Sequence, residues 1–472
     1  MRSSFLSRIT APFRKRHYEG GAPSRRWRGI PVTPDQAQAA VVARAPTAQR
    51  ARFVGINAPL GRSALEGWAN ALVGSGIKST SAAADEAMRG QINAQFEVWT
   101  DHADADGTLD WYGLQLLAAQ RLVVDGEAFA LLINRPEGLR VRLIDPELVD
   151  SSITKDLADG GVIIQGIELD AQGRRRAYHI RQPSLTMTAS ATLKTVRVDA
   201  ADVVHLYRKD VAGQQRGISW LSPVLQRLVD MDMWRDAELA RQKFSSALVC
   251  VITRKQGGDG VPNLGEMSQT PDHSALEGGI RTGTYVVIDD NNYESNFSNP
   301  AQIGSETIDF ARSLEREIAA GVGMPVHILT GNLENVNYSS IRAGLIEFRQ
   351  RVEAYQYHLL VRQLLRPVWE RWIATEVLAG RIRGTVDAAL PVRWTPPKLA
   401  WIDPLKDAQS EAEAIAAGLM SRTQAIAARG DDAERLDAEI AADKAREKRL
   451  GLDFSAKPTP AANTNLPAAI AA

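Results

Sequence analysis

A short glycine-rich stretch near the start of the chain has residue types that could bind a nucleotide. ALVGSGIKST, residues 71–80, contains two glycines, a lysine and a Ser-Thr pair. A phosphate-binding loop follows the pattern G-x-x-x-x-G-K-[ST], in which backbone N–H groups and the lysine surround the phosphates. Here the glycines are too close together, and Ile77 separates Gly76 from Lys78. We therefore interpret the stretch as a short strand at residues 72–73 followed by a glycine turn, with Lys78 as a surface charge.

Other residues that could support chemistry are scattered or wrongly spaced. His327 and His358 have no carboxylate or cysteine at ligand spacing, so they predict no metal site. DHADADG resembles part of a calcium loop, but when Gly107 takes the sixth place, His102 and Gly113 take the first and twelfth, which require carboxylates. No G-x-S-x-G nucleophile motif occurs. We expect no catalytic residue, no metal and no cofactor.

The composition is that of a globular chain without a charge bias. The chain has 472 residues, 44% of them hydrophobic, and 56 basic residues balance 56 acidic ones. This balance excludes a global basic field for gripping nucleic acid. The single cysteine, Cys250, excludes an intramolecular disulfide and a cysteine metal cluster. No apolar run of about eighteen residues predicts a membrane span.

Hydrophobic periodicity switches between helix and strand along the chain. Residues 61–119 are typical of helices, with turns at Gly74 and Gly107. EAFALLIN, LRVRLID and DVVHLYR have the pattern of strands, and GVIIQGIELDAQGRRRAYHI that of a two-stranded hairpin turning at DAQG. Residues 125–208 are therefore expected to form a small β-rich unit. Helices are expected over residues 223–246 and 305–322, with the strands ALVCVITR and TYVVIDD between them.

The segment MPVHILTGNLENVNYSS, residues 324–340, breaks all periodicity. It predicts a loop of seventeen residues, and loops of that length are often functional. An apolar stripe at helical spacing follows, formed by Ile341, Leu345, Phe348, Val352 and Tyr355. We expect this stripe to be a structural helix core and Pro367 to kink or locally break the helix.

The order of these elements resembles that of tailed-bacteriophage portal proteins of the lambda type. The strongest match is LEREIAAGVGMPVHILTGNLENVNYSSIRAGLIEFRQRV, whose core G-x-P-x-x-x-L-T-G…N-x-N-Y-S-S-x-R is similar to that of the family. WANALVGSGIKST, GISWLSPVLQRLVDMDMWRDAELARQKFSSALVCVI and AGLMSRTQAIAARGDDAE are weaker matches that occur in the family's order. The resemblance covers about residues 10 to 450.

The resemblance implies an α+β portal fold with a wing, long stem helices, a small β-containing clip and a helical crown, assembling as a ring. It divides the chain into nine parts: a basic, partly disordered arm 1–49, the wing 50–222, a stem helix 223–246, the clip 247–304, a stem helix 305–323, the channel (tunnel) loop 324–340, a long wing helix 341–376, the crown 377–450 and a disordered tail 451–472.

The implied function is that of a portal, or head-tail connector, without enzymatic activity. Such a ring, usually of twelve copies, occupies one capsid vertex, where a terminase packages double-stranded DNA that is later ejected. The implied partners are further copies of the chain, this DNA, the terminase large subunit, the major capsid protein or scaffold, and a head-completion or tail adaptor protein, with no membrane. The implied location is the virion, after assembly in the host cytoplasm.

The channel loop is expected to contact the DNA. Asn332, Asn335, Asn337 and Tyr338 are polar without charge, which would let phosphates slide past, whereas Glu334 carries the only formal charge in the loop. Two alternatives remain open. One is a DNA-packaging or DNA-processing enzyme, such as a terminase-like ATPase or a nuclease. The other is a different virion connector or adaptor, although such proteins are typically much shorter.

Overall fold

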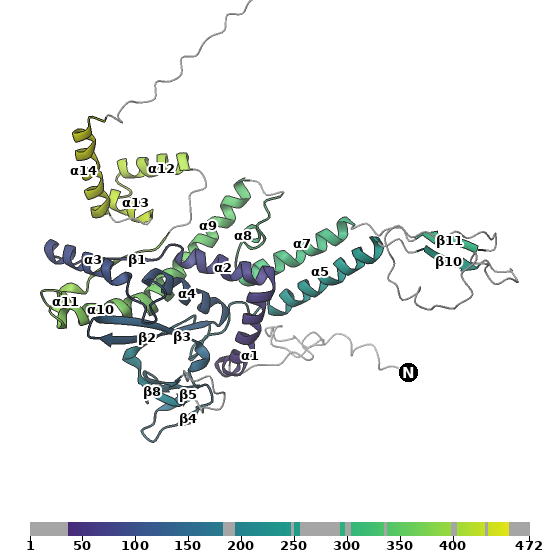
Figure 1. Ribbon diagram of the computed structural model, residues 1–472, viewed down its shortest axis with the longest axis horizontal. Helices are drawn as coiled ribbons and strands as arrows, with labels where there is room; N and C mark the ends of the chain where they lie inside the picture. The colour runs from purple at the N-terminus through teal and green to yellow at the C-terminus, as the bar shows by residue number, and fades with distance from the viewer. Residues whose placement is uncertain are drawn as a thin grey trace, which may run out of the picture.

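The computed structural model describes most of the chain. The described residues are 36–182, 194–246, 250–254, 293–297, 304–334, 338–397, 404–429 and 433–452. Most of the expected arm, most of the expected clip including TYVVIDD, and nearly all of the expected tail therefore lie outside the described residues. Figure 1 shows a body of helices and sheets from which two long helices extend. Mixed helix and sheet confirms the predicted α+β class.

Four helices build the first part of the body. They are α1 (Gln36–Asn57), α2 (Pro59–Val73), α3 (Glu86–Thr100) and α4 (Trp111–Val124). The strand predicted at residues 72–73 was wrong, because Leu72 and Val73 are the last residues of α2 and are fully buried on its inner face. The chain then turns at Gly74, whose φ is 49°. The strand of this stretch is β1 (Lys78–Ser81), which pairs antiparallel with β12 (Val392–Thr395).

Two antiparallel sheets form the predicted β-rich unit. The three-stranded sheet has the order β3-β2-β9, with β2 at Glu127–Arg135, β3 at Gly138–Ile144 and β9 at Val203–Tyr207. The five-stranded sheet runs from β4 to β8 in sequence order, with β4 at Lys155–Asp156, β5 at Val162–Ile164, β6 at Ile167–Leu169, β7 at Arg175–Arg181 and β8 at Thr195–Asp199. Two short 3₁₀ helices, η3 (Pro146–Leu148) and η4 (Ala200–Asp202), accompany these sheets.

The predicted hairpin has three strands rather than two. Its second turn, at DAQG, lies where the sequence placed it, but a turn at Gln165 and Gly166 divides its first strand into β5 and β6. Gly166 has a φ of 81°, and a side-chain carbon added there would lie 2.7 Å from the carbonyl oxygen of Asp150. Only glycine fits both the conformation and the space.

The two long helices are α5 (Leu225–Ser246) and α7 (Ser305–Val322), which lie side by side (Figure 1). The ion pairs Arg227–Glu317 (3.0 Å) and Arg235–Glu315 (2.8 Å) link them. Their ring contact is between Trp234 and Phe310, whose centroids are 5.6 Å apart. At the far end, β10 (Cys250–Arg254) pairs antiparallel with β11 (Tyr293–Phe297).

The segment after α7 differs from its prediction at its start, and the long helix changes its turns just before Pro367. The residues predicted to be a continuous loop contain a short helix, α8 (Val326–Thr330). The long helix that follows runs as α9 (Tyr338–Tyr355), the π-helical segment η5 (Gln356–Leu365) and α10 (Arg366–Leu378). Pro367 does not end the helix, because the wider turns of η5 directly precede it, and the N–H of Arg366 donates to the carbonyl of Val361, five residues earlier.

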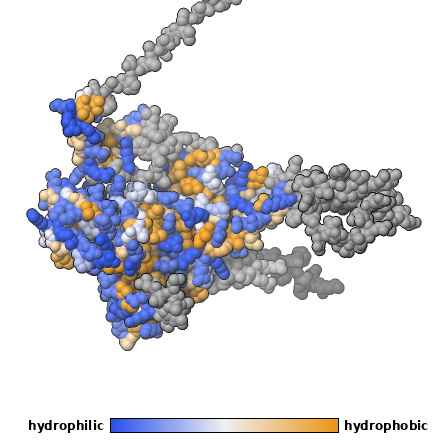
Figure 2. Space-filling view, viewed as in Figure 1, coloured by the Kyte–Doolittle hydropathy of each residue, from blue (hydrophilic) through white to orange (hydrophobic). Residues whose placement is uncertain are grey.

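Aromatic side chains fill the core where α10 meets the first helices. The ring of Phe96 lies 4.9 Å from both Trp369 and Trp372, and these two tryptophans are almost fully buried. The remaining helices are α11 (Val386–Ala389), α12 (Pro404–Ala416), α13 (Arg422–Ala428) and α14 (Ala433–Leu450). Figure 2 shows small apolar groups among hydrophilic residues on the visible face of the body, in keeping with the balanced composition.

Candidate functional site

The turn from α7 into α8 is fixed by contacts from two other helices. α7 ends at Val322 and is followed by the capping residue Gly323, whose φ of 76° is left-handed and whose N–H donates to the carbonyl of Ala319 at 2.9 Å. Trp68 Nε1 of α2 donates to the carbonyl of Val322 (3.1 Å), and Arg351 Nη1 of α9 donates to that of Gly323 (2.6 Å). The carbonyls of Ala319, Val322 and Gly323 thereby have donors, and the chain leaves the helix in a defined direction.

The first half of the predicted channel loop is folded against the body. Ser63 Oγ of α2 donates to the carbonyl of Leu329 at 2.6 Å, and Leu329 is buried. After α8, Asn332 N–H donates to Thr330 Oγ1 (3.2 Å), and the Asn332 side chain accepts from Glu334 N–H (2.7 Å). This asparagine turn holds the backbone of the exposed tip.

The exposed tip consists of residues 331–334. Asn332, Leu333 and Glu334 are all exposed, Leu333 by 63%. Glu334, the only formal charge in the predicted loop, lies 3.3 Å from Arg312 Nη2 of α7 and forms an ion pair with it. Both side chains reach solvent, so the pair contributes little stability, about 0–1 kcal/mol.

The other predicted loop residues are less completely described. Asn335 and Asn337 lie outside the described residues, and Tyr338 is described by its backbone alone, as the first residue of α9. The structure therefore brings Asn332 and Glu334 together and leaves the rest of the predicted set as a prediction.

The apolar stripe of the long helix enters the core part-way along. Ile341 and Leu345 are half-buried, whereas Phe348 and Val352 are each 3% exposed. Tyr355 is half-buried, and its ring lies 5.0 Å from that of Trp220, in the loop before α5. The packed part of the stripe thus joins the long helix to the base of α5.

Residues 71–80 do not form a phosphate cradle. The N–H of Gly76 donates to the carbonyl of Val73 (2.7 Å), and that of Ile77 donates to Gln115 Oε1 (2.8 Å). These donors are already used inside the protein, whereas a phosphate loop presents its N–H groups to the ligand. Lys78 is half-buried at the start of β1, opposite Thr395, rather than a fully exposed surface charge.

The calcium-like stretch is a structural turn. Asp104 accepts from the N–H groups of Asp106 (3.0 Å), Thr108 (2.9 Å) and Leu109 (3.0 Å). Burial opposes its charge, but these donors outweigh burial and lower the pKa of its carboxyl. Within the described part of the chain, no group of three or more His, Cys, Asp or Glu residues is placed to hold a metal ion. None of the described helices is long and apolar enough to cross a membrane.

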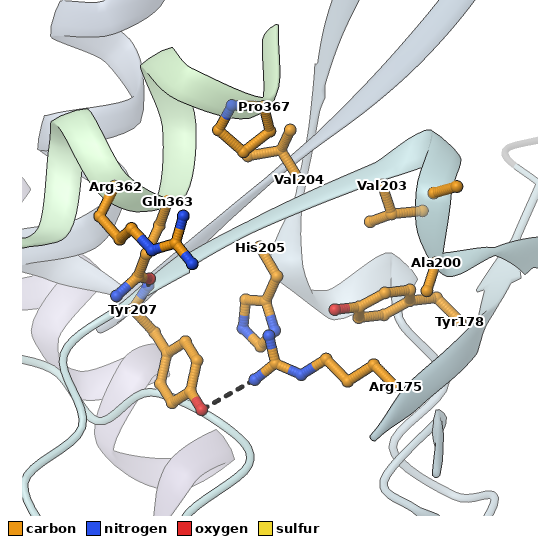
Figure 3. Close-up of a pocket in the computed structure, with 11 residues that line it drawn as sticks. Arg175, Tyr178, Ala200, Val203, Val204, His205, Tyr207, Arg362, Gln363 and Pro367 are labelled. Carbon is orange, nitrogen blue, oxygen red and sulfur yellow. Dashed lines mark hydrogen bonds between the residues drawn. The ribbon is translucent and has the colours of Figure 1, made fainter. Parts of the chain in front are cut away.

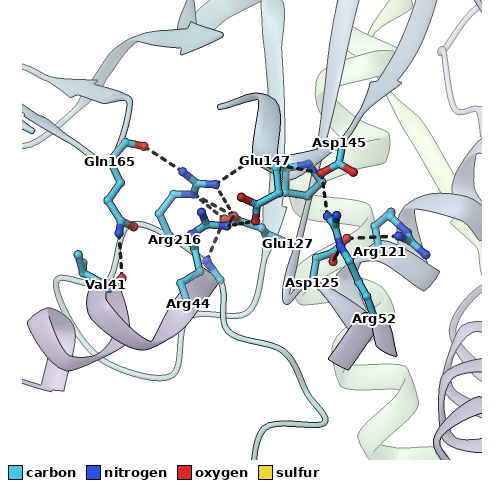
Figure 4. Close-up of polar contacts among 12 residues, drawn as sticks. Val41, Arg44, Arg52, Arg121, Asp125, Glu127, Asp145, Glu147, Gln165 and Arg216 are labelled. Atoms are coloured by element: carbon cyan, nitrogen blue, oxygen red, sulfur yellow. Dashed lines mark hydrogen bonds and ion pairs between the residues drawn. The ribbon is translucent and has the colours of Figure 1, made fainter. Parts of the chain in front are cut away.

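A buried ionic network that the sequence did not predict joins α1, β2 and the loop before α5 (Figure 4). Its centre is Glu127, which is fully buried and accepts from Arg216 Nη2 (2.6 Å), His205 Nε2 (3.1 Å) and Gly217 N–H (3.0 Å). Arg44 of α1 lies 3.4 Å away. Burial opposes the Glu127 charge, but Arg216 and His205 outweigh it and hold the pKa of the carboxyl far below its usual range.

A second set of charges lies beside this network. Arg52 of α1 lies 2.6 Å from Asp125 and 2.7 Å from Asp145, and Arg121 lies 3.5 Å from Asp125 (Figure 4). Burial raises the pKa of Asp125 despite these partners. The two sets position α1 and the base of α5 against the three-stranded sheet.

A hollow of about 620 Å³ lies between β7, β9 and η5 (Figure 3). His205 is stacked between Phe129 and Tyr207, with ring centroids 4.1 and 4.5 Å away. Burial lowers the pKa of His205 to about 3, so the ring is neutral at pH 7, and its Nε2–H donates to the Glu127 carboxylate. Arg175 Nη2 donates to the Tyr207 hydroxyl at 2.8 Å, and this hydroxyl donates onward to a backbone carbonyl.

The comparison with protein families decides the assignment. The family model described as "Phage portal protein, lambda family" matches residues 21–356. The chain belongs to this family. The portal protein is thus a phage portal or connector, as the sequence resemblance predicted, and its family is one of structural connectors.

Individual relatives of the portal protein are more distant. A "Probable portal protein" of Halomonas phage phiHAP-1 is 25% identical over 389 residues, covering 78% of this chain and 73% of the relative. The neck of a native gene transfer agent particle, computed with C12 symmetry, has a TM-score of 0.45 at 14% identity, covering 81% of this chain and 91% of its own. An HK97 family phage portal protein from Corynebacterium diphtheriae has a TM-score of 0.32 at 12% identity, covering 66% and 92%. These scores are too low to add to the assignment.

The buried charges of the portal protein could not be predicted from the sequence, for a physical reason. Glu127 begins a strand, and Arg44 lies in a helix that contains no acidic residue. No spacing rule connects them to Arg216, because packing brings them together from three separate elements. One local signal for a buried charge was present: the acidic residue Glu127 lies directly before the apolar pattern that predicts β2.

Proposed function

We propose that this portal protein assembles as a ring of twelve copies at one capsid vertex and that double-stranded DNA passes through the ring during packaging and ejection. In this proposal α5 and α7 belong to the stem, β10 and β11 to the clip, and residues 324–340 to the channel loop. Residues 50–222 and 341–376 form the wing, and residues 377–450 the crown. Family membership supports the ring and the passage of DNA.

The loop assignment rests on one observation: residues 331–334 are exposed, whereas the preceding helix α8 is held against the body. Leu329 is tied to Ser63, whereas Asn332 and Leu333 project into solvent. Cations bind DNA phosphates tightly because binding releases counterions. A tip without lysine or arginine, whose one acid is paired with Arg312, would contact DNA without holding it. Asn335, Asn337 and Tyr338 extend this uncharged set in the proposal.

The remaining partners follow from the same role. The terminase large subunit, acting as the motor, supplies the energy for DNA movement, and the ring contributes no catalysis. The major capsid protein or scaffold surrounds the ring, and a head-completion or tail adaptor protein attaches later. Assembly takes place in the host cytoplasm, and the protein then remains in the virion.

Deleting residues 332–337 tests the loop assignment. Rings should still form, since the deletion begins after α8, ends before α9 and spares the anchors on Ser63 and Trp68, but DNA packaging or retention should fall. Particle images of the purified protein measure ring formation, and nuclease-protected DNA per capsid measures packaging. A matched variant replaces the same six residues with glycine and serine, which keeps the length and removes the side chains.

The outcomes separate the parts of the proposal. Loss of rings in the deletion variant would show that these residues hold subunits together and would overturn the loop assignment. Packaging and DNA retention that match wild type would overturn it as well. Monomers in the wild-type protein under assembly conditions would count against the ring itself.

A further inference from the structure

The hollow between β7, β9 and η5 has hydrogen-bond donors directed into it from two sides (Figure 3). Arg175 comes from β7, and Arg362 and Gln363 come from the π-helical segment η5. A π-helix has wider turns than an α-helix and occurs often at functional sites. Here its turns place Arg362 and Gln363 beside the same hollow.

The three side chains have few acceptors of their own. Arg175 hydrogen-bonds to the hydroxyls of Tyr207 (2.8 Å) and Tyr178, and its guanidinium lies 5.1 Å from the centre of the Tyr207 ring, but it has no ion pair with any described residue. Arg362 is exposed and has no ion pair with any described residue. Gln363 Oε1 accepts from Tyr207 N–H at 2.9 Å, which leaves its Nε2 group to face another acceptor.

The acidic groups around the hollow are already engaged. Glu127, behind His205, is bound by Arg216, and Asp202, beside the hollow, is bound by Arg371. Neither carboxylate balances the charge of Arg175 or Arg362. The described lining therefore presents two arginines without a carboxylate partner and a side-chain amide donor, groups to which an anion can bind.

We propose that this hollow binds a small oxyanion, a phosphate or a carboxylate, between the guanidinium groups of Arg175 and Arg362. A guanidinium offers paired N–H donors whose geometry matches both groups, and an oxyanion accepts without donating. The anion links β7 to η5, and so the five-stranded sheet to the long helix. Two sources supply this chemistry: free phosphate, and an acidic side chain of a neighbouring copy in the assembled ring.

Inorganic phosphate is the probe for the test. It is titrated into the unassembled full-length chain at constant ionic strength set with sodium chloride, and binding is followed by the phosphorus NMR linewidth and by calorimetry. Arg362→Gln should weaken binding about tenfold or more, because it removes a charge-assisted contact. Arg383→Gln, at an exposed arginine outside the hollow, is the matched control and should bind as wild type does.

Arg362 is exposed, so its substitution should leave folding intact, which thermal unfolding checks. Arg175→Gln removes a contact of Tyr207 and is interpreted only if the variant melts near wild type. Phosphate binding that is absent in the wild type, or equal in wild type and Arg362→Gln, would overturn the proposal.

A second arm identifies the source. If free phosphate is the ligand, the assembled wild-type ring keeps its phosphate affinity, and Arg362→Gln assembles normally. If a neighbouring carboxylate is the ligand, assembly displaces phosphate, and Arg362→Gln weakens assembly. Neither arm depends on DNA passage, so failure here leaves the conduit proposal standing.

Discussion

Replacing Glu127 with glutamine tests how the buried network stabilises the body. Glutamine keeps the shape of the side chain and removes its charge. Arg216 then loses its partner at 2.6 Å, while Arg44 keeps Glu147 at 3.3 Å, a carboxylate that is 34% exposed. Breaking a buried pair typically costs about 3–5 kcal/mol, because the remaining charge stays buried without compensation. Since Arg44 keeps one partner, we expect a loss near the lower end, about 3 kcal/mol of unfolding free energy.

Urea unfolding followed by tryptophan fluorescence measures this loss, under conditions in which the chain is unassembled. Glu66→Gln is the control, because the pair Arg62–Glu66 is exposed on both sides and should contribute about 0–1 kcal/mol. Adding Arg216→Met to Glu127→Gln should restore part of the loss, since it removes the uncompensated charge. A Glu127→Gln variant within about 1 kcal/mol of wild type would refute the argument that this carboxylate holds the arginines in place.

Two further predictions concern the long helix and pH. Val352→Asp should lower the free energy of unfolding by several kcal/mol, because it buries a charge at a site that is 3% exposed. Leu345→Asp, at a half-buried site, should lower it by less. Equal losses of stability in thermal unfolding would contradict the burial argument. The pKa of His205 is about 3 when folded against 6.5 when unfolded, so the unfolded chain takes up the proton first and stability should fall as pH drops from about 6.5 to 3. His205→Phe, which keeps the ring stack, should reduce this slope by up to about 1.4 kcal/mol per pH unit, and an unchanged slope between pH 6 and 4.5 would exclude His205 as its source.

Several elements were predictable because their signals are local. The apolar periodicity of α5 and α7 and the alternation of β2 and β3 predicted helices and strands that the structure contains. The short elements were missed. α8 is five residues long, too short for a period to emerge, and depends on the contact of Leu329 with Ser63. Leu72 and Val73 looked like a strand because two β-compatible apolar residues before a glycine fit either structure.

The π-helical segment η5 had no usable signal either. Its residues continue the apolar periodicity of α9, and Pro367 predicted a kink or a local break without saying what form it would take. The structure keeps the helix continuous and widens the turns before the proline, which also places Arg362 and Gln363 at the hollow. Proline has no N–H to donate, and a helix can adjust to this loss at different points along its length. The neighbours packed around the helix decide which point it is.

The family could be recognised from the sequence, because the glycine, proline, asparagine and arginine residues of its motif lie in one continuous segment. The long helices could be predicted too, because their periodicity is local. Which charges are buried together, and which donors share a hollow, became visible in the folded chain alone. Glu127, Arg44 and Arg216 lie in separate elements, as do Arg175 and Arg362, and no spacing rule relates them. Such sites arise when packing brings distant segments into contact and removes water from between them, and burial then sets the protonation and partners of each group.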